Sequence, residues 1–344
     1  MKKLLIDVLC NDGSPLGVTL ADVYGNNGRL GVGGAELALL TMCEAWHNAG
    51  HHVRLYNSPT HMGLSPFEQY PVDTFLPKDE RDILIVFRSP NHRILHANGK
   101  KIWWSTDQFT VGDFRQFESK VDQIVTISPF HDNFFKETYG IENTTIIDLP
   151  VRMEDYDHEI EKVEHRMIFC SVPDRGLDIL ARAYPGIKRQ VPDASLVITS
   201  DYRLWGVQDA RNERFIQRFL GMDGVRFLGA VQRMEMVEEQ LKAEVMAYPC
   251  TYDELFCYAV AECQVAGAYP VTTSKGALIT TNMAYQVPGE AENPHWLSSF
   301  IDAVVSTITS KSLKVTSEFN QAEARERFSL ERIMKEWDKV MENE

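Results

Sequence analysis

The sequence predicts an α/β protein made of two doubly wound domains, each with a parallel sheet covered by helices. Short apolar segments typical of strands alternate with helical segments along the chain, which is the pattern of parallel α/β sheets. The alternation stops at residues 151–165, an acidic stretch without apolar periodicity, and then restarts. The chain of 344 residues is also longer than one hydrophobic core usually serves. We therefore expect two domains joined by a linker.

The first half of the chain contains short apolar segments with polar ends, which predict buried strands. These segments are residues 3–10, 52–57, 83–88, 101–106, 123–128 and 144–150. A helix is predicted at 34–50, where Gly50 ends it. Another is predicted at 129–139, because Pro129 fits the first turn of a helix, where a missing N–H costs nothing.

The second half repeats this alternation. Strands are predicted at residues 166–172, 194–200, 225–231, 245–250 and 268–273. Helices are predicted at 176–191, where Pro185 should kink or interrupt the helix, and around 233–243. We place an N-terminal domain at 1–155, a C-terminal domain at 156–325, and a closing helix within 326–344 that packs back on the N-terminal domain. Ligands of open α/β sheets bind at the carboxyl ends of the strands, so the cleft between the domains is the expected binding site.

Composition argues against several functional classes. The net charge of −14 argues against general nucleic-acid binding. No apolar run reaches the length of a membrane span, and the start MKKLLIDVLCNDG becomes polar too soon for a signal peptide. The six cysteines lack metal-ligand spacing and several lie in apolar runs, which indicates buried thiols in a reducing cytoplasm. We expect a cytoplasmic protein, and its oligomeric state is not predicted.

Glycines precede the first predicted helix in the segment GRLGVGGAELALL, residues 28–40. The free N–H groups and the dipole at a helix start attract anions, and glycine lets a phosphate or sugar approach the backbone. Gly33 and Gly34 are therefore candidate phosphate neighbours. A flexible loop before an ordinary helix is the alternative. A dinucleotide-binding fingerprint fits poorly, because the third glycine is absent.

Arg175 lies at the start of a predicted helix in PDRGLDIL, residues 173–180. A cation beside a helix N-terminus is slightly unfavourable unless an anion bridges the two. A diphosphate would provide that bridge, since arginine binds phosphate bidentately. A surface arginine without a ligand is the alternative.

Two glutamates, Glu254 and Glu262, flank seven residues in TYDELFCYAVAECQVAGAYPVTT, residues 251–273. Glu254 follows a strand that Pro249 closes, and Glu262 lies among apolar residues where an unpaired carboxylate would be unfavourable. Carboxylates accept hydrogen bonds from the paired hydroxyls of a sugar or ribose. The alternatives are an ordinary carboxylate near a helix start for Glu254 and a buried salt bridge for Glu262.

The chain resembles retaining glycosyltransferases of family 4, which have the GT-B fold of two Rossmann-like domains facing a cleft. The resemblance spans nearly the whole chain, and the spacing of Glu254 and Glu262 matches the family's Glu, seven residues, Glu motif. Three longer segments carry the rest of the likeness: GGAELALLTMCEAWHNAGHHVRLYN, VDQIVTISPFHDNFFKETYGI, and the stretch from VRFLGAV to TTSKGA.

The resemblance implies a metal-independent transfer of a sugar, with retention, from a nucleotide-diphosphate sugar to an acceptor hydroxyl. Glu254 would bind hydroxyls of the donor sugar, Glu262 the ribose diol, and Arg175 the leaving diphosphate. Gly33 and Gly34 would border that phosphate. The backbone amides that would hold the sugar and diphosphate are those of Leu255, Phe256, Cys257 and Tyr258. No cofactor is implied beyond the donor substrate.

The chain departs from the family pattern at two places. The family has two cations near Arg175, and only one is evident here, so Lys275 or Arg88 would have to compensate. Many members have a histidine before the aspartate near WWSTDQ, whereas this chain has Thr106 and then Asp107, which would border the reacting sugar carbon. Asp107 is therefore a third predicted catalytic residue beside Arg175 and Glu254.

Other interpretations stay open. A nucleotide-sugar epimerase would need acid–base carboxylates near the sugar that are not evident. A nucleotide-sugar-binding protein without turnover fits the missing cation and Thr106. Asp155-Tyr156-Asp157 resembles a metal-binding Asp-x-Asp motif, but a solvated linker is favoured, and no metal site is predicted. The basic stretch before Trp103 and Trp104, residues 92–101, fits an anionic acceptor, a peripheral membrane contact or, preferably, an ordinary strand entry. The acceptor is not predicted.

Overall fold

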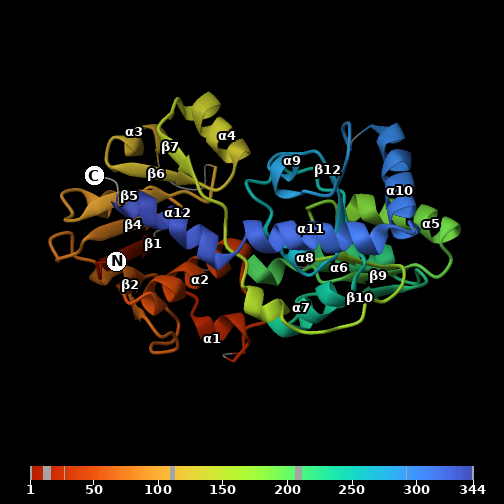
Figure 1. The fold of residues 1–344 in the computed structure, drawn as a ribbon, viewed down its shortest axis with the longest axis horizontal. Helices are drawn as coiled ribbons and strands as arrows, with labels where there is room; N and C mark the ends of the chain where they lie inside the picture. The colour runs from red at the N-terminus through yellow and green to blue at the C-terminus, as the bar shows by residue number, and fades with distance from the viewer. Residues whose placement is uncertain are drawn as a thin grey trace. The chain divides into compact units, whose positions relative to one another are not determined.

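The computed structural model describes residues 2–10, 17–26, 28–108, 113–205, 211–291 and 293–342. The chain divides into two compact units (Figure 1). Unit 1 comprises Met1–Pro150 and Leu330–Glu344, and unit 2 comprises Val151–Ser329. Each unit contains one parallel β-sheet with helices around it.

Unit 1 is built on a seven-stranded parallel sheet in the order β3-β2-β1-β4-β5-β6-β7. Its strands are β1 (Leu5–Cys10), β2 (His52–Tyr56), β3 (Glu68–Tyr70), β4 (Ile83–Phe87), β5 (Lys100–Trp104), β6 (Gln123–Thr126) and β7 (Thr144–Ile146). Its helices are α1 (Leu20–Val23), α2 (Gly34–Asn48), α3 (Phe114–Glu118), α4 (Pro129–Tyr139) and α12 (Leu330–Glu342), with 3-10 turns η1 (Val72–Thr74) and η2 (His92–Ile94). The change of strand order at β1 is that of a doubly wound fold.

Helix α12 completes the core of unit 1 although it lies at the far end of the sequence. Trp337 packs edge-on against Trp46 and Trp104, with ring centroids 5.3 and 5.1 Å apart. Lys100, part of the basic stretch before the two tryptophans, donates from Nζ to the carbonyl of Val340 at 2.8 Å. The apolar face of this helix is therefore buried, as amphipathic spacing predicts.

Unit 2 is built on a six-stranded parallel sheet in the order β10-β9-β8-β11-β12-β13. Its strands are β8 (Arg166–Phe169), β9 (Ser195–Ile198), β10 (Val225–Phe227), β11 (Val245–Tyr248), β12 (Tyr269–Thr273) and β13 (Tyr285–Val287). Its helices are α5 (Leu177–Gln190), α6 (Arg211–Phe219), α7 (Arg233–Lys242), α8 (Tyr258–Val265), α9 (Leu278–Thr281), α10 (Pro294–Ile308) and α11 (Leu313–Arg327), with 3-10 turns η3 (Met153–Tyr156) and η4 (Tyr202–Trp205).

Several details differ from the sequence-based expectation. Helix α5 continues through Pro185 without interruption. Residues 151–155 belong to unit 2, which continues to Ser329, whereas the closing helix α12 begins at Leu330, within its expected range. The expectation of a solvated linker was wrong at Asp155 and Tyr156, which are 4% and 2% exposed. None of the described helices is both long enough and apolar enough to span a bilayer.

Candidate functional site

The turn after β8 and the loop after β11 meet at one edge of the unit 2 sheet. The two strands are parallel neighbours, so their carboxyl ends lie together. Gly176, between Arg175 and α5, has a φ of 101°, and a Cβ added there would lie 2.1 Å from the carbonyl oxygen of Pro249. Only glycine allows both this conformation and this approach. The close contact places Arg175 beside the loop that carries Glu254.

A second glycine holds that loop from the other side. A Cβ on Gly276 would lie 2.6 Å from the backbone nitrogen of Glu254. The next residue, Ala277, donates its N–H to the carbonyl of Glu254 at 2.7 Å. The backbone of Glu254 is thus fixed between the ends of β11 and β12.

The side chains of Arg175 and Glu254 form an ion pair, with 3.1 Å between Nε and Oε1. Tyr248 donates its hydroxyl to the same Oε1 at 2.9 Å. Burial raises the pKa of Glu254 above its ordinary value, against the opposing charge of Arg175. Burial would lower the pKa of Arg175, but the charge of Glu254 raises it overall. The structure therefore brings together the two residues predicted for the sugar and the diphosphate.

The first turn of α8 follows directly. Phe256 and Cys257 are buried at 2% and 7% exposure, and Cys257 caps the helix with a left-handed φ of 69°. The first amides of a helix have no partner within that helix. This geometry places the N–H groups of the Leu255–Tyr258 segment at the same sheet edge as Arg175.

Lys275 follows β12 at that edge. Its Nζ lies 3.9 Å from a carboxylate oxygen of both Asp253 and Glu290, so neither contact is close. It lines a small cavity of about 100 Å³ with Cys250 and Thr273. Lys275 is thus a cation at the same sheet edge, between two loosely placed carboxylates.

Glu262 occupies a buried ion network on α8. Its Oε1 lies 2.5 Å from Nη1 of Arg233, whose Nε lies 2.8 Å from Asp155. All three side chains are 3–4% exposed. Burial raises the pKa of Glu262, and Arg233 opposes that shift. The structure thus shows the buried salt bridge that the sequence left as the alternative for Glu262.

In unit 1, the glycine-rich helix start is occupied by a carboxylate of the same chain. Gly33 is the N-cap of α2, and a Cβ there would lie 2.5 Å from Oε2 of Glu36. Glu36 pairs with Nη2 of Arg88 at 2.7 Å. The start of α2 at Gly33 and Gly34 therefore faces a negative group, and Arg88 is committed to it.

Asp107 lies after β5 in unit 1 and is held through its backbone. The carbonyl of Asp107 lies 3.2 Å from Nε2 of His131, and Nδ1 of His131 accepts from the N–H of Ile127 at 3.4 Å. Since Nδ1 accepts, Nε2 carries the proton and donates to Asp107. His131 is fully buried, which lowers its pKa to about 3.

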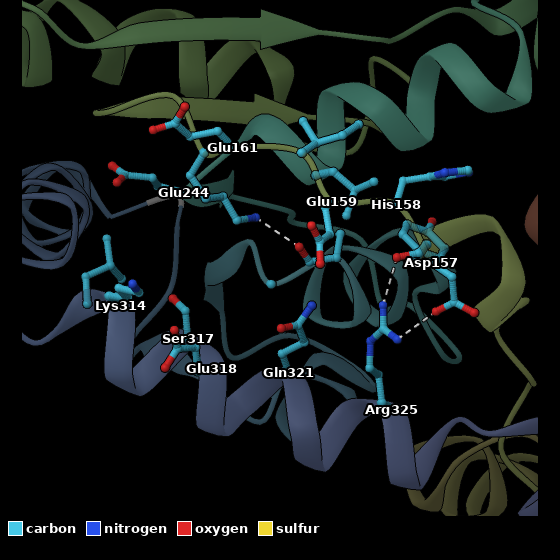
Figure 2. A pocket seen from close by; sticks show the side chains of 17 residues that line it. Asp157, His158, Glu159, Glu161, Glu244, Lys314, Ser317, Glu318, Gln321 and Arg325 are labelled. Atoms are coloured by element: carbon cyan, nitrogen blue, oxygen red, sulfur yellow. Dashed lines mark hydrogen bonds and ion pairs between the residues drawn. The ribbon is translucent and has the colours of Figure 1, made fainter.

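A separate pocket in unit 2 has a volume of about 1160 Å³ and is lined by residues 156–162 and by α11. Figure 2 shows Arg325 on α11 pointing toward Asp157, and their Nη1–Oδ1 distance is 3.1 Å. No predicted site residue lines this pocket. It is therefore distinct from the edge that carries Arg175 and Glu254.

The structure gathers the unit 2 candidates at one sheet edge, except that the carboxylate of Glu262 is bound to Arg233. Gly33, Gly34 and Asp107 belong to unit 1. Sequence reasoning missed the supporting residues, which are Gly176, Gly276, Tyr248, Arg233 and His131. The glycine after Arg175 was a usable signal, because glycine often marks a close backbone approach. Tyr248 gave no signal, because a tyrosine in a buried strand is usual. Arg233 gave none, because its partners Asp155 and Glu262 lie 78 and 29 residues away.

Comparison with known proteins identifies a fold and a family match. Residues 165–309 match the family described as glycosyl transferases group 1. No curated protein matches the sequence. Similar solved structures include a sucrose-phosphate synthase from Thermosynechococcus elongatus, at 14% identity and a TM-score of 0.70 over 98% of each chain.

Two further structures show the same likeness. A glycosyltransferase from Rickettsia africae has 14% identity and a TM-score of 0.73, covering 99% of this chain and 98% of its own. HepE from Anabaena, solved with UDP and glucose, has 14% identity and a TM-score of 0.67, covering 98% of this chain and 99% of its own. The GT-B architecture predicted from the sequence is confirmed.

Proposed function

We propose that this chain, which has the GT-B fold and matches the group 1 glycosyltransferase family over residues 165–309, transfers a sugar from a nucleotide-diphosphate sugar to an acceptor hydroxyl. Unit 2 binds the donor. The contact between Arg175 and Glu254 beside the first turn of α8 carries this proposal. A diphosphate is bound by a cation and N–H donors, whereas sugar hydroxyls donate to acceptors such as a carboxylate. This sheet edge offers all three kinds of group.

The chemistry follows from charge. Breaking the bond between the anomeric carbon and the diphosphate leaves positive charge on the sugar and negative charge on the phosphate. Arg175 and the amides at the start of α8 stabilise the phosphate as it leaves, without a metal. The acceptor hydroxyl attacks from the departing side and gives its proton to the phosphate, so configuration is retained. No carboxylate nucleophile is assigned, unlike in retaining glycosidases.

The nucleotides bound in similar structures suggest which donor to test first. HepE was solved with UDP and glucose, and a pneumococcal O-GlcNAc transferase, GtfA, with UDP and GlcNAc. We propose a uridine-based donor as the first to test. Titration calorimetry with UDP, GDP and ADP, and then with their sugars, tests donor binding. If none binds in the micromolar to millimolar range, the proposal fails.

Turnover separates this function from its alternatives. A donor that binds should lose its sugar to water slowly, in the presence of EDTA, and the released sugar should keep its anomeric configuration by NMR. Epimerised sugar would favour the epimerase. Binding without any release would favour a nucleotide-sugar-binding protein.

Substitution of Glu254 by Gln is expected to weaken binding of the intact nucleotide sugar about 10- to 100-fold more than binding of the nucleoside diphosphate, which loses only the support that Glu254 gives to Arg175. A charge-assisted hydrogen bond to a hydroxyl is worth about 1.5–3 kcal/mol, and only the sugar makes it. Calorimetry with UDP-glucose and UDP measures both. Glu318→Gln, an exposed glutamate on α11, is the control. Equal losses for both ligands would remove Glu254 from sugar recognition.

We propose donor-binding roles for the remaining predicted residues as well. These are Glu262, Gly33, Gly34 and Lys275, with Asp107 beside the reacting carbon. The same titrations on Glu262→Gln report whether its carboxylate also contacts the nucleoside.

A further inference from the structure

The guanidinium group of Arg175 lies over the ring of Tyr252. Cζ of Arg175 is 3.6 Å from the ring centroid, and Tyr252 is 39% exposed. Tyr252 comes from the loop after β11, whereas Arg175 comes from the turn after β8. The contact therefore joins the ends of two neighbouring strands. A guanidinium on an aromatic face is held by cation–π attraction and by stacking of the two planes.

Arg175 is thus held in two different directions. Glu254 binds Nε at 3.1 Å, at the edge of the guanidinium plane. Tyr252 covers one face of that plane. The edge contact limits rotation within the plane, and the face contact limits tilt. A long arginine side chain has much rotamer entropy to lose, so fixing it before a ligand arrives favours binding.

We propose that Tyr252 is a positioning residue that orients the Arg175 guanidinium toward the phosphates of the ligand. This inference rests on the proposed function, because it assigns Arg175 a diphosphate. Tyr252 acts through Arg175 and does not itself touch the ligand. The aromatic ring makes the contact, so Tyr252→Phe should preserve the positioning of Arg175 and Tyr252→Leu should abolish it.

A double-mutant cycle tests this role with UDP as the probe, and with GDP and ADP in the same assay. Tyr252→Leu should weaken binding of the diphosphate about 5- to 30-fold, the range of a partly desolvated cation–π contact. It should weaken binding of the corresponding monophosphate by less than about twofold, since the monophosphate lacks the second phosphate group. Tyr252→Phe should bind like the wild type. In an Arg175→Lys background, Tyr252→Leu should cause no further loss.

A second readout reports the geometry directly. The guanidinium Nε–H resonance of Arg175, assigned by its disappearance in Arg175→Lys, should be shifted upfield by the ring. The shift should persist in Tyr252→Phe and vanish in Tyr252→Leu. Tyr285→Leu, which removes another exposed tyrosine of unit 2, should change neither the resonance nor the binding. Thermal unfolding of each variant checks that the fold is intact.

Distinct failures have distinct meanings. If the wild type binds no nucleoside diphosphate, the proposed function falls and takes this inference with it. If the wild type binds and Tyr252→Leu binds equally well, only the positioning role falls. If Tyr252→Leu causes equal losses in the wild-type and Arg175→Lys backgrounds, Tyr252 contacts the ligand itself, which also overturns the role.

Discussion

Substitution of Arg233 by Met is expected to lower the free energy of unfolding of unit 2 by about 3–5 kcal/mol, because it leaves buried carboxylates without their cation. Arg233 is 4% exposed and contacts Asp155 at 2.8 Å and Glu262 at 2.5 Å. These three residues come from α7, η3 and α8. Removing the guanidinium leaves two buried carboxylates that repel each other, since the charge of Asp155 raises the pKa of Glu262 even in the wild type.

The loss should depend on pH with a defined sign. Without Arg233, burial and the charge of Asp155 raise the pKa of Glu262 further above that of the unfolded chain. A group with a raised pKa contributes stability at low pH and loses it as pH rises through the folded value. The deficit of Arg233→Met relative to the wild type should therefore be smaller at pH 5 than at pH 8.

The measurement needs a probe of unit 2 alone, since a protein with two units need not unfold in one step. Hydrogen–deuterium exchange of peptides from η3 and α8, over a range of urea concentrations, supplies one. The control is Arg233→Met combined with Asp155→Asn and Glu262→Gln, which buries no charge and should recover at least half of the loss. If the single variant lost less than about 1 kcal/mol, or the neutral variant recovered nothing, the ion network would not be what stabilises this region.

The fold could be predicted from the sequence because its strands and helices follow from the apolar pattern of short segments. Apolar runs such as residues 83–88 and 245–250 became central strands, β4 and β11, at nearly the expected positions. The strands that sequence reasoning missed, β3 and β13, are three-residue edge strands with exposed positions and little apolar pattern. Pro185 was misleading because the helix around it is long and firmly packed, and burial of the α5 face outweighs one lost hydrogen bond.

The candidate site was accessible only in part, since the sequence names residues but not their partners. Arg175 and Glu254 were found from their places beside helix starts, and the structure pairs them. The partner of Glu262 was not found, because Arg233 sits at the start of a polar helix where an arginine usually faces solvent. The ion pair between Glu36 and Arg88 could likewise not be predicted from the sequence. The two residues are far apart in the chain, and only the fold brings the first turn of α2 to the end of β4.

Acidification is expected to destabilise unit 1 through His131. This side chain is fully buried and its pKa is lowered from 6.5 to about 3, chiefly by burial. The unfolded chain binds a proton below the ordinary histidine pKa, whereas the folded chain does not until the pH approaches the lowered value. The stability that His131 contributes is thus fully present above about pH 6.5 and is lost as pH falls toward 3, at about 1.4 kcal/mol for each pH unit.

Variants isolate this effect from that of the carboxylates, which also titrate in acid. Unit 1 needs its own probe, since Trp205 and Trp296 of unit 2 also fluoresce. Hydrogen–deuterium exchange of peptides from α4, which carries His131, supplies one over a range of urea concentrations. His131→Asn should be less stable than the wild type at pH 7, because it loses the contacts to Ile127 and Asp107. Its stability should nevertheless fall less steeply between pH 6 and 4, by about 1 kcal/mol for each unit.

The exposed His61 supplies the matched control, since His61→Asn should keep the steep wild-type slope. An NMR titration of the wild type gives an independent check, in which the ring protons of His131 should not move between pH 8 and 5. Equal slopes for wild type and His131→Asn, or a His131 signal that titrates near pH 6, would mean that the ring reaches water. The link from His131 to the Asp107 carbonyl would then be too weak to hold that backbone in place, because a charged imidazolium donates from Nδ1 as well and cannot accept from Ile127.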